Sequence, residues 1–226
     1  TNGGVANMYS VFAVTSPDKG EQGISAFVVD RETQGLSPGK PENKMGMRGS
    51  NTTDVVFEEC EVPQENLLGE RGAGLRQTLA TLDGGRVGIA ALSLGLAQAA
   101  LEETARYAQE RQSFGVPISQ HQAIQWMLAD VSTEVEAARL LVYQAAWRKG
   151  QRLPFTKQAA MAKLFASETA ERAAYKALQV NGSYGYSQEY PVERIYRDQR
   201  LMTIGEGTSE IQRIVIARQV LREMQF

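Results

Sequence analysis

The spacing of apolar residues changes near residue 70, and this change predicts two structurally different parts. Before that point, short runs rich in Val, Phe and Thr are separated by turn residues, a pattern typical of antiparallel strands. The expected strands are Met8–Val14, Ile24–Asp30 and Thr53–Glu59. After Gly74, apolar residues recur at intervals of three and four, as in Leu92, Leu96 and Ala99, which indicates amphipathic helices.

Long helices joined by short loops favour an up-and-down bundle in the second part. The expected helices are Leu75–Gln109, Gln120–Lys149, Pro154–Asn181 and Gly207–Met224, with a shorter one at Val192–Leu201. The predicted fold class is α+β: a partial antiparallel β-domain over residues 1–70, followed by an up-and-down four-helix bundle over residues 71–226. Because the chain opens on what looks like a loop entered partway, Thr1–Gly4, we expect a C-terminal fragment of a longer protein.

Composition excludes several classes of function. The chain has 24 basic and 26 acidic residues, so no overall charge excess attracts nucleic acid or an anionic membrane. Cys60 is the only cysteine and His121 the only histidine, which excludes an internal disulfide and leaves too few ligands for a Cys- or His-based metal site. No uninterrupted apolar stretch approaches the roughly 20 residues that span a bilayer. We therefore expect a soluble protein without a metal or nucleic-acid partner.

The segment Ile204–Gln212 carries the first candidate chemistry, because it places Glu206 between two glycines just before a helix. Glycine permits unusual backbone angles and close approach of a ligand. Ser209 and Gln212 have the spacing of a capping box that opens a helix over Glu210–Glu223, and free amides at a helix start favour negative charge. Taken alone, such a segment is more often only a well-formed turn and helix cap.

Other motifs occur in a fixed order around this segment. They are Met45–Ser50, Phe57–Pro63, Arg111–Gly115, His121–Gln125, Gln179–Tyr186, Glu189–Asp198 and Gly205–Ser209. In this order and at these intervals, they resemble the acyl-CoA dehydrogenase family, and the resemblance covers essentially the whole chain. Each motif is weak by itself, but the ordered set makes Glu206 a candidate catalytic base.

The resemblance implies an FAD-dependent enzyme that oxidises an acyl-CoA thioester to the trans-2-enoyl-CoA. In that reaction Glu206 removes the α proton while the β hydride passes to the flavin. The same resemblance implies a role in fatty acid β-oxidation, a homotetramer and an electron-transfer flavoprotein as acceptor. It also implies a location in the bacterial cytoplasm or the mitochondrial matrix.

The resemblance also assigns the remaining site residues by position. FAD contacts fall on Thr1, Arg111, Gln122, Gln179, Val180, Asn181, Gly182, Ser183, Thr208, Ser209 and Glu210. Substrate contacts fall on Asp83, Gly84, Gly85, Arg86 and Gly207. Arg111 matches an arginine that reaches FAD pyrophosphate in a neighbouring subunit, a role suited to a permanently charged planar donor.

Two departures from the family pattern affect the expected site. Some branched-chain and long-chain members carry the base on the first bundle helix, where this chain has Gly85, so Glu206 is the only matching base. A tyrosine often precedes the catalytic acid, whereas this chain has Gly205, which leaves the chain-length preference open.

Two alternatives stay open beside the dehydrogenase. One is an acyl-CoA oxidase or another flavoenzyme of the same fold, which oxygen consumption with acyl-CoA would reveal. The other is a non-catalytic helical assembly module, which an inactive protein with bound flavin would support.

Overall fold

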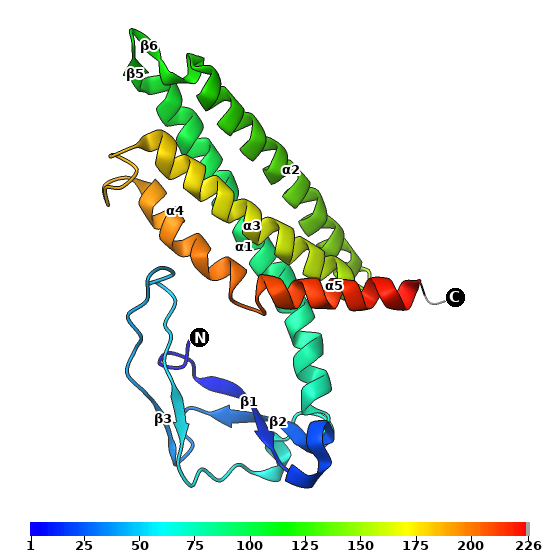
Figure 1. Cartoon of the computed structure of the whole chain (residues 1–226). Helices are drawn as coiled ribbons and strands as arrows, with labels where there is room; N and C mark the ends of the chain where they lie inside the picture. The colour runs from blue at the N-terminus through cyan, green and yellow to red at the C-terminus, as the bar shows by residue number, and fades with distance from the viewer. Residues whose placement is uncertain (225–226) are drawn as a thin grey trace. The chain divides into compact units, whose positions relative to one another are not determined.

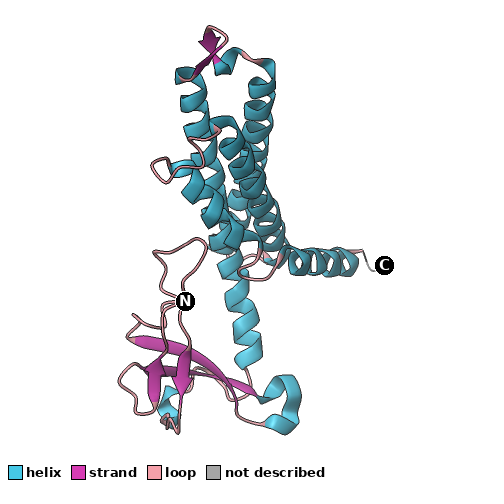
Figure 2. Cartoon of the chain, turned by 60° about the vertical axis from the view of Figure 1, so that its left-hand side comes forward, coloured by secondary structure: helices cyan, strands magenta, loops and turns pink. Residues whose placement is uncertain are grey.

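The computed structural model describes residues 1–224, and it divides the chain into two compact units (Figure 1). The first unit is Thr1–Leu82 and the second begins at Asp83, so the division falls inside a long helix. The predicted domain boundary at residues 70 and 71 lies just before that helix and stays a prediction. The first unit holds the longer strands and the second is mainly helical, as the colours of Figure 2 show, and the α+β fold class is confirmed.

The first unit contains two small antiparallel sheets. Strands β1 (Met8–Val14) and β2 (Ile24–Asp30) pair along their full length, with Met8 opposite Asp30 and Val14 opposite Ile24. Both strands have the bounds that the sequence pattern predicts. Strands β3 (Leu36–Pro38) and β4 (Val55–Phe57) form the second pair.

Strand β3 lies where the sequence composition predicted a turn. It lies between Gly35 and Gly39 and ends at Pro38, and glycine and proline favour turns in isolation. Gly35 has φ 84°, and a Cβ there would lie 2.2 Å from the Glu58 carbonyl oxygen. The glycine therefore serves close approach of two backbones at the start of the sheet.

The helices follow the predicted order, with bounds within a few residues of those expected. They are α1 (Gly74–Glu110), α2 (Gln122–Gly150), α3 (Thr156–Asn181), α4 (Pro191–Gln199) and α5 (Ser209–Glu223). A two-residue hairpin pair, β5 (Gln112–Ser113) and β6 (Val116–Pro117), joins α1 to α2. Helix α3 packs against α2, α4 and α5, and both views show α5 running across the long helices (Figures 1 and 2).

Small side chains line the interface of the long helices. The core of the second unit joins Val and Leu from α1 and α2 to a row of alanines on α3. These alanines are Ala159, Ala162, Ala166, Ala170, Ala173, Ala174 and Ala177. Small residues let helix backbones approach closely, and alanine has the highest helix propensity, so the same residues favour the helix and its packing.

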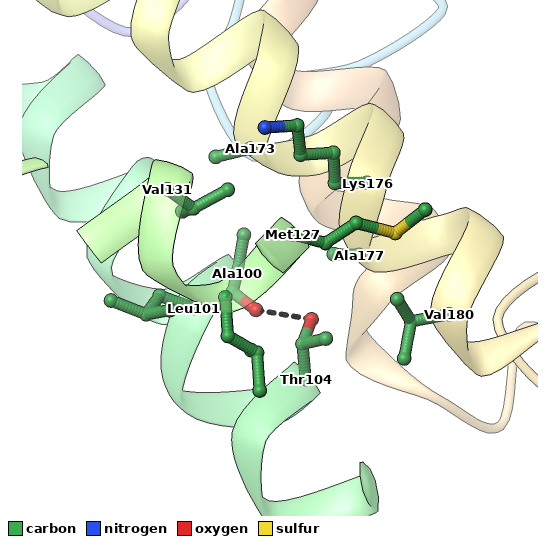
Figure 3. Close-up of a pocket in the computed structure, with 10 residues that line it drawn as sticks. Ala100, Leu101, Thr104, Met127, Val131, Ala173, Lys176, Ala177 and Val180 are labelled. Carbon is green, nitrogen blue, oxygen red and sulfur yellow. Dashed lines mark hydrogen bonds between the residues drawn. The ribbon is translucent and has the colours of Figure 1, made fainter. Parts of the chain in front are cut away.

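The bundle interior leaves little free space. A cavity of about 10 Å³ lies between α1, α2 and α3, bordered by Leu101, Met127 and Val180 (Figure 3). Thr104 closes its polar edge by donating to the Ala100 carbonyl at 2.6 Å. Since a single water needs about 10–15 Å³, this cavity has no room for a cofactor or substrate.

Helix α1 is long and apolar enough by composition to cross a membrane, with a mean hydropathy of 1.2 over one 18-residue window. The sequence expectation considered only uninterrupted apolar runs and missed this. Buried core helices meet the same test, however, and Ala90, Leu94 and Ala97 of α1 lie in the bundle core. Of that apolar window, 39% is buried within the structure.

Candidate functional site

The loop before α5 holds Glu206 in a strained backbone conformation. It follows a short 3-10 helix, Arg200–Thr203, and ends at Thr208, the residue that caps α5. Glu206 has φ 56° and Gly207 has φ 90°, so two successive residues occupy the left-handed region. A non-glycine residue there costs on the order of 1–3 kcal/mol, which the surrounding contacts must offset.

Two fully buried side chains hold this loop through its carbonyl groups. The Gln212 Nε2 donates to the Gly207 oxygen at 2.8 Å and to the Glu206 oxygen at 3.3 Å. The Lys163 Nζ on α3 donates to the same Gly207 oxygen at 2.8 Å. Both side chains have 0% exposure. The strained turn is therefore anchored from inside the bundle.

The Glu206 carboxylate lies against α1 at Gly85. A Cβ built on Gly85 would be 2.5 Å from Oε2 and 2.9 Å from Cδ of Glu206. Ordinary van der Waals contact begins at about 3.4 Å, so no side chain fits at position 85 while the carboxylate stays in place. Glu206 as a residue is exposed, but its carboxylate is directed to one defined point on the helix.

The cap of α5 differs from the prediction by one residue. Thr208 is the N-cap, and its hydroxyl accepts from the Ile211 amide at 3.4 Å. Ser209, expected to form a capping box with Gln212, is instead the first helical residue. The capping-box prediction is wrong because the Gln212 amide turns inward to the loop carbonyls, where it meets buried acceptors.

A cleft of about 330 Å³ borders this helix start. It is lined by Glu168, Glu171, Arg172, Arg200, Thr203, Ile204, Thr208, Ser209 and Glu210. The Ser209 hydroxyl is buried and has no hydrogen-bond partner within residues 1–224. A hydrogen bond from Thr208 holds the pKa of the Glu210 carboxyl below its usual range. The cleft therefore combines cations, carboxylates, a helix N-terminus and an unpaired hydroxyl, a mixture suited to a polar, phosphate- or hydroxyl-bearing ligand.

The predicted substrate residues at the start of the second unit form an internal polar cluster. Arg86 Nη1 donates to Asp83 Oδ1 at 2.7 Å, and the Thr156 hydroxyl donates to Asp83 Oδ2 at 2.6 Å. Arg86 is only 6% exposed. The structure thus gives Arg86 a partner within the chain, and its predicted contact with substrate stays a prediction. Gly84, by contrast, leaves its Cβ position about 3.0 Å from the Lys149 Nζ.

The other predicted cofactor residues gather at a different place. Arg111 follows α1 and its guanidinium lies 5.8 Å from the centre of the Tyr184 ring. Gln122 is exposed at the start of α2, and Gln179–Asn181 end α3. Gly182 ends that helix with φ 59°, its amide donating to the Leu178 carbonyl at 3.0 Å. Thr1 is exposed and belongs to the first unit.

The two groups in the second unit are far apart along one helix. Gly85 and Arg111 are separated by 26 residues, and at 1.5 Å per residue this corresponds to about 39 Å. Ligand pockets of 300–1,000 Å³ are roughly 10 Å across, so the two groups of one chain do not line a single compact pocket. Within residues 1–224, no group of three or more His, Cys, Asp or Glu residues is arranged to hold a metal ion.

Sequence reasoning missed Lys163 as a residue of this site. Burial, together with the nearby Arg86 charge, lowers the pKa of Lys163 to about 8. A signal was present in the sequence, since Lys163 falls four residues after Ala159 and three before Ala166, in the middle of an apolar helix face. A charged residue at such a position requires a buried partner, and only the folded chain identifies it as the Gly207 carbonyl.

Comparison with known proteins gives a consistent result. The family model "Acyl-CoA dehydrogenase, C-terminal domain" matches residues 72–221, and "Acyl-CoA dehydrogenase, middle domain" matches residues 1–60. The "Probable acyl-CoA dehydrogenase YngJ" of Bacillus subtilis is 54% identical over 223 residues, which are 98% of this chain and 59% of that protein. The "Caffeyl-CoA reductase-Etf complex subunit CarC" of Acetobacterium woodii is 48% identical over 213 residues, 94% of this chain and 56% of that protein.

A solved structure confirms the architecture. The butyryl-CoA dehydrogenase of Megasphaera elsdenii superposes with a TM-score of 0.97 at 48% identity, over 98% of this chain and 58% of that one. The chain thus spans less than two thirds of the relatives that it matches.

Proposed function

This chain belongs to the acyl-CoA dehydrogenase family, and on that premise we propose that the protein is an FAD-dependent acyl-CoA dehydrogenase that forms trans-2-enoyl-CoA. The observation that carries the proposal is the Glu206 carboxylate lying against Gly85. The carboxylate occupies the space that a side chain at position 85 would fill, so the glycine is what lets the proposed base lie against α1.

Glu206 is the general base in this proposal. Its carboxylate accepts the α proton of the thioester, and the glycines beside it leave the approach open. A carboxylate is a weak base for a C–H bond, so the site must acidify the substrate by hydrogen bonds to the thioester carbonyl, where negative charge develops. The backbone amide of Glu206 is the proposed donor from this chain, and the anchored loop fixes its direction.

The residues near α5 fit an FAD molecule. The unpaired Ser209 hydroxyl, the start of α5 and the cations of the 330 Å³ cleft suit the hydroxyl and phosphate groups of a dinucleotide. Thr208, Ser209 and Glu210 are proposed to hold its adenosine side. When bound, FAD accepts the two electrons that leave the substrate.

The second group, around Arg111, supports an assembly of several copies. Because about 39 Å separates Arg111 from Gly85, we propose that Arg111, Gln122 and residues 179–183 serve the FAD of a neighbouring copy in a homotetramer. Large apolar side chains are exposed on α2 and α5, as expected of an interface. They are Trp126, Leu140, Tyr143, Trp147, Ile211, Ile214, Leu221 and Met224. Light scattering of the flavin-loaded protein tests this state, and a monomeric holoenzyme would contradict it.

The acceptor and location follow from the same proposal. A relative is named as a subunit of a complex with Etf, which supports an electron-transfer flavoprotein as the partner. A role in β-oxidation, in the bacterial cytoplasm or the mitochondrial matrix, is the corresponding expectation. We further propose that residues 1–70 complete a β-domain and that residues 71–226 form the helical domain.

Anaerobic mixing of the holoenzyme with a panel of acyl-CoAs tests the function. Bleaching of the flavin absorbance reports reduction, and the preferred chain length is read from the rates. In Glu206→Gln, we expect acyl-CoA binding to persist while flavin reduction slows by roughly 10³-fold, since an amide cannot accept the proton.

Glu136→Gln is the matched control, because Glu136 lies on α2 and pairs with Arg139 at the surface. Reduction of the Glu206→Gln enzyme at the rate of this control would remove Glu206 from the mechanism. Rapid oxygen consumption by the wild-type enzyme with acyl-CoA would instead assign the protein to the oxidases.

A further inference from the structure

Lys163 is the largest fully buried side chain of the described residues, and the proposed reaction does not use it. It lies on α3 in the alanine-rich face that packs the bundle. Removing an ammonium group from water costs several kcal/mol unless its partners compensate. A buried lysine at this position therefore calls for a physical reason beyond packing.

Lys163 contacts the backbone of the loop that carries Glu206. The Nζ donates to the Gly207 oxygen at 2.8 Å, and Gln212 donates to the same oxygen at the same distance. One carbonyl thus receives two buried donors, which occupy both of its lone pairs. This carbonyl follows directly after Glu206, whose φ of 56° needs external support.

We propose that Lys163 is a positioning residue for the base: its ammonium fixes the Gly207 peptide and thereby directs the Glu206 carboxylate to Gly85. The inference rests on the proposed function for its catalytic consequence. The structural part of the inference, that the Lys163 contact holds the loop, does not depend on the reaction.

The charges around Lys163 come from every element near the loop. Arg86 on α1 opposes its charge, while Glu168 on α3, Glu206 on the loop and Glu210 on α5 favour it. Glu168 is also paired with Arg213 at 2.6 Å. The ammonium therefore lies between one cation and three carboxylates, one of which is the base that it positions.

Lys163→Met separates positioning from folding. Methionine has a similar length and lacks the charge and the donor, and Gln212 still satisfies the Gly207 carbonyl. Removing the ammonium also removes the several kcal/mol that its burial costs, so we expect the variant to fold and to bind FAD.

The first readout is hydrogen–deuterium exchange of the amides in residues 204–208, which needs no substrate. We expect exchange at least tenfold faster in Lys163→Met than in the wild-type holoenzyme, because one anchor of the loop is lost. The second readout is anaerobic flavin reduction, where we expect a 10- to 100-fold lower rate and less than a threefold change in acyl-CoA affinity.

Lys176→Met is the matched control on the same helix, since Lys176 forms a surface pair with Asp130 at 3.0 Å. It should match the wild type in both readouts. Unchanged loop exchange in Lys163→Met overturns the proposal. Faster exchange with a wild-type reduction rate also overturns it, because the base then works without this anchor.

Failure of the proposed function gives a different result from failure of the Lys163 proposal. In that case no acyl-CoA reduces the wild-type flavin, while the exchange experiment still decides whether Lys163 holds the loop. If Lys163→Met does not accumulate as holoenzyme, Gln212→Met removes the other donor of the same carbonyl. Faster exchange and slower reduction there support the proposal, and wild-type behaviour overturns it.

Discussion

The variant Gly85→Ala separates the effect of the Glu206 carboxylate position on activity from effects on the stability of the fold. The substitution adds one methyl group to α1 at the point where the Glu206 carboxylate lies. The contacted atoms are the far end of a flexible side chain, so the carboxylate moves while the helix stays. Activity and stability are therefore expected to change in opposite directions.

The size of both effects follows from the geometry. The new Cβ lies 2.5 Å from Oε2, and ordinary contact begins at 3.4 Å, so the carboxylate must retreat by about 0.9 Å. A misplacement of about 1 Å in a reacting geometry lowers the rate roughly 100-fold, or about 2.7 kcal/mol. In the helix interior, alanine is more favourable than glycine by about 0.8–1.0 kcal/mol, which should raise the free energy of unfolding.

Rapid anaerobic flavin reduction and urea unfolding of the holoenzyme measure the two quantities. Gly88→Ala is the control, because it makes the same change three residues further along α1, where a Cβ meets nothing within 4 Å. It should gain similar stability and keep its reduction rate. Equal reduction rates in the two variants would refute the argument that the Gly85 surface sets the position of the base.

Two further predictions concern stability. Ala145→Leu should lower the free energy of unfolding, measured with urea, by about 1–3 kcal/mol, because Ala145 is fully buried in the bundle core. Ala146 next to it is exposed, so Ala146→Leu should be nearly neutral. Equal losses of stability in the two variants would contradict a tightly packed core. The pKa of Lys163 is lowered from 10.5 to about 8 in the folded chain, so between these pH values the unfolded chain binds more protons and stability should rise with pH. Lys163→Met should lose this rise, and an unchanged slope would show that another group causes it.

Most of the fold follows from local patterns. Strands β1 and β2 have the predicted bounds because they are short runs rich in Val and Phe that turn residues enclose. The long helices follow from apolar residues spaced at three and four. Strand β3 was missed because three residues between two glycines carry too little periodicity, and their pairing with β4 is a long-range contact.

The site divides in the same way. The motif order predicts Glu206, and its flanking glycines indicate an unusual backbone. The cap was placed one residue too late, because Ser209 and Thr208 have equivalent capping side chains and only the folded loop selects between them. For Arg86 the sequence did not show its partner within the chain, since its pairing with Asp83 depends on the folded structure. Its predicted contact with substrate stays a prediction.

The amino-acid sequence by itself determined the succession of strands and helices and the family, because these depend on local spacing and on motifs in order. From the same motifs it predicts Glu206 as the acidic residue of the site. Only the tertiary structure decided that this acid meets Gly85 and that Lys163 and Gln212 hold its loop. Those contacts join residues far apart in the chain, and their geometry depends on how α1, α3 and α5 pack together.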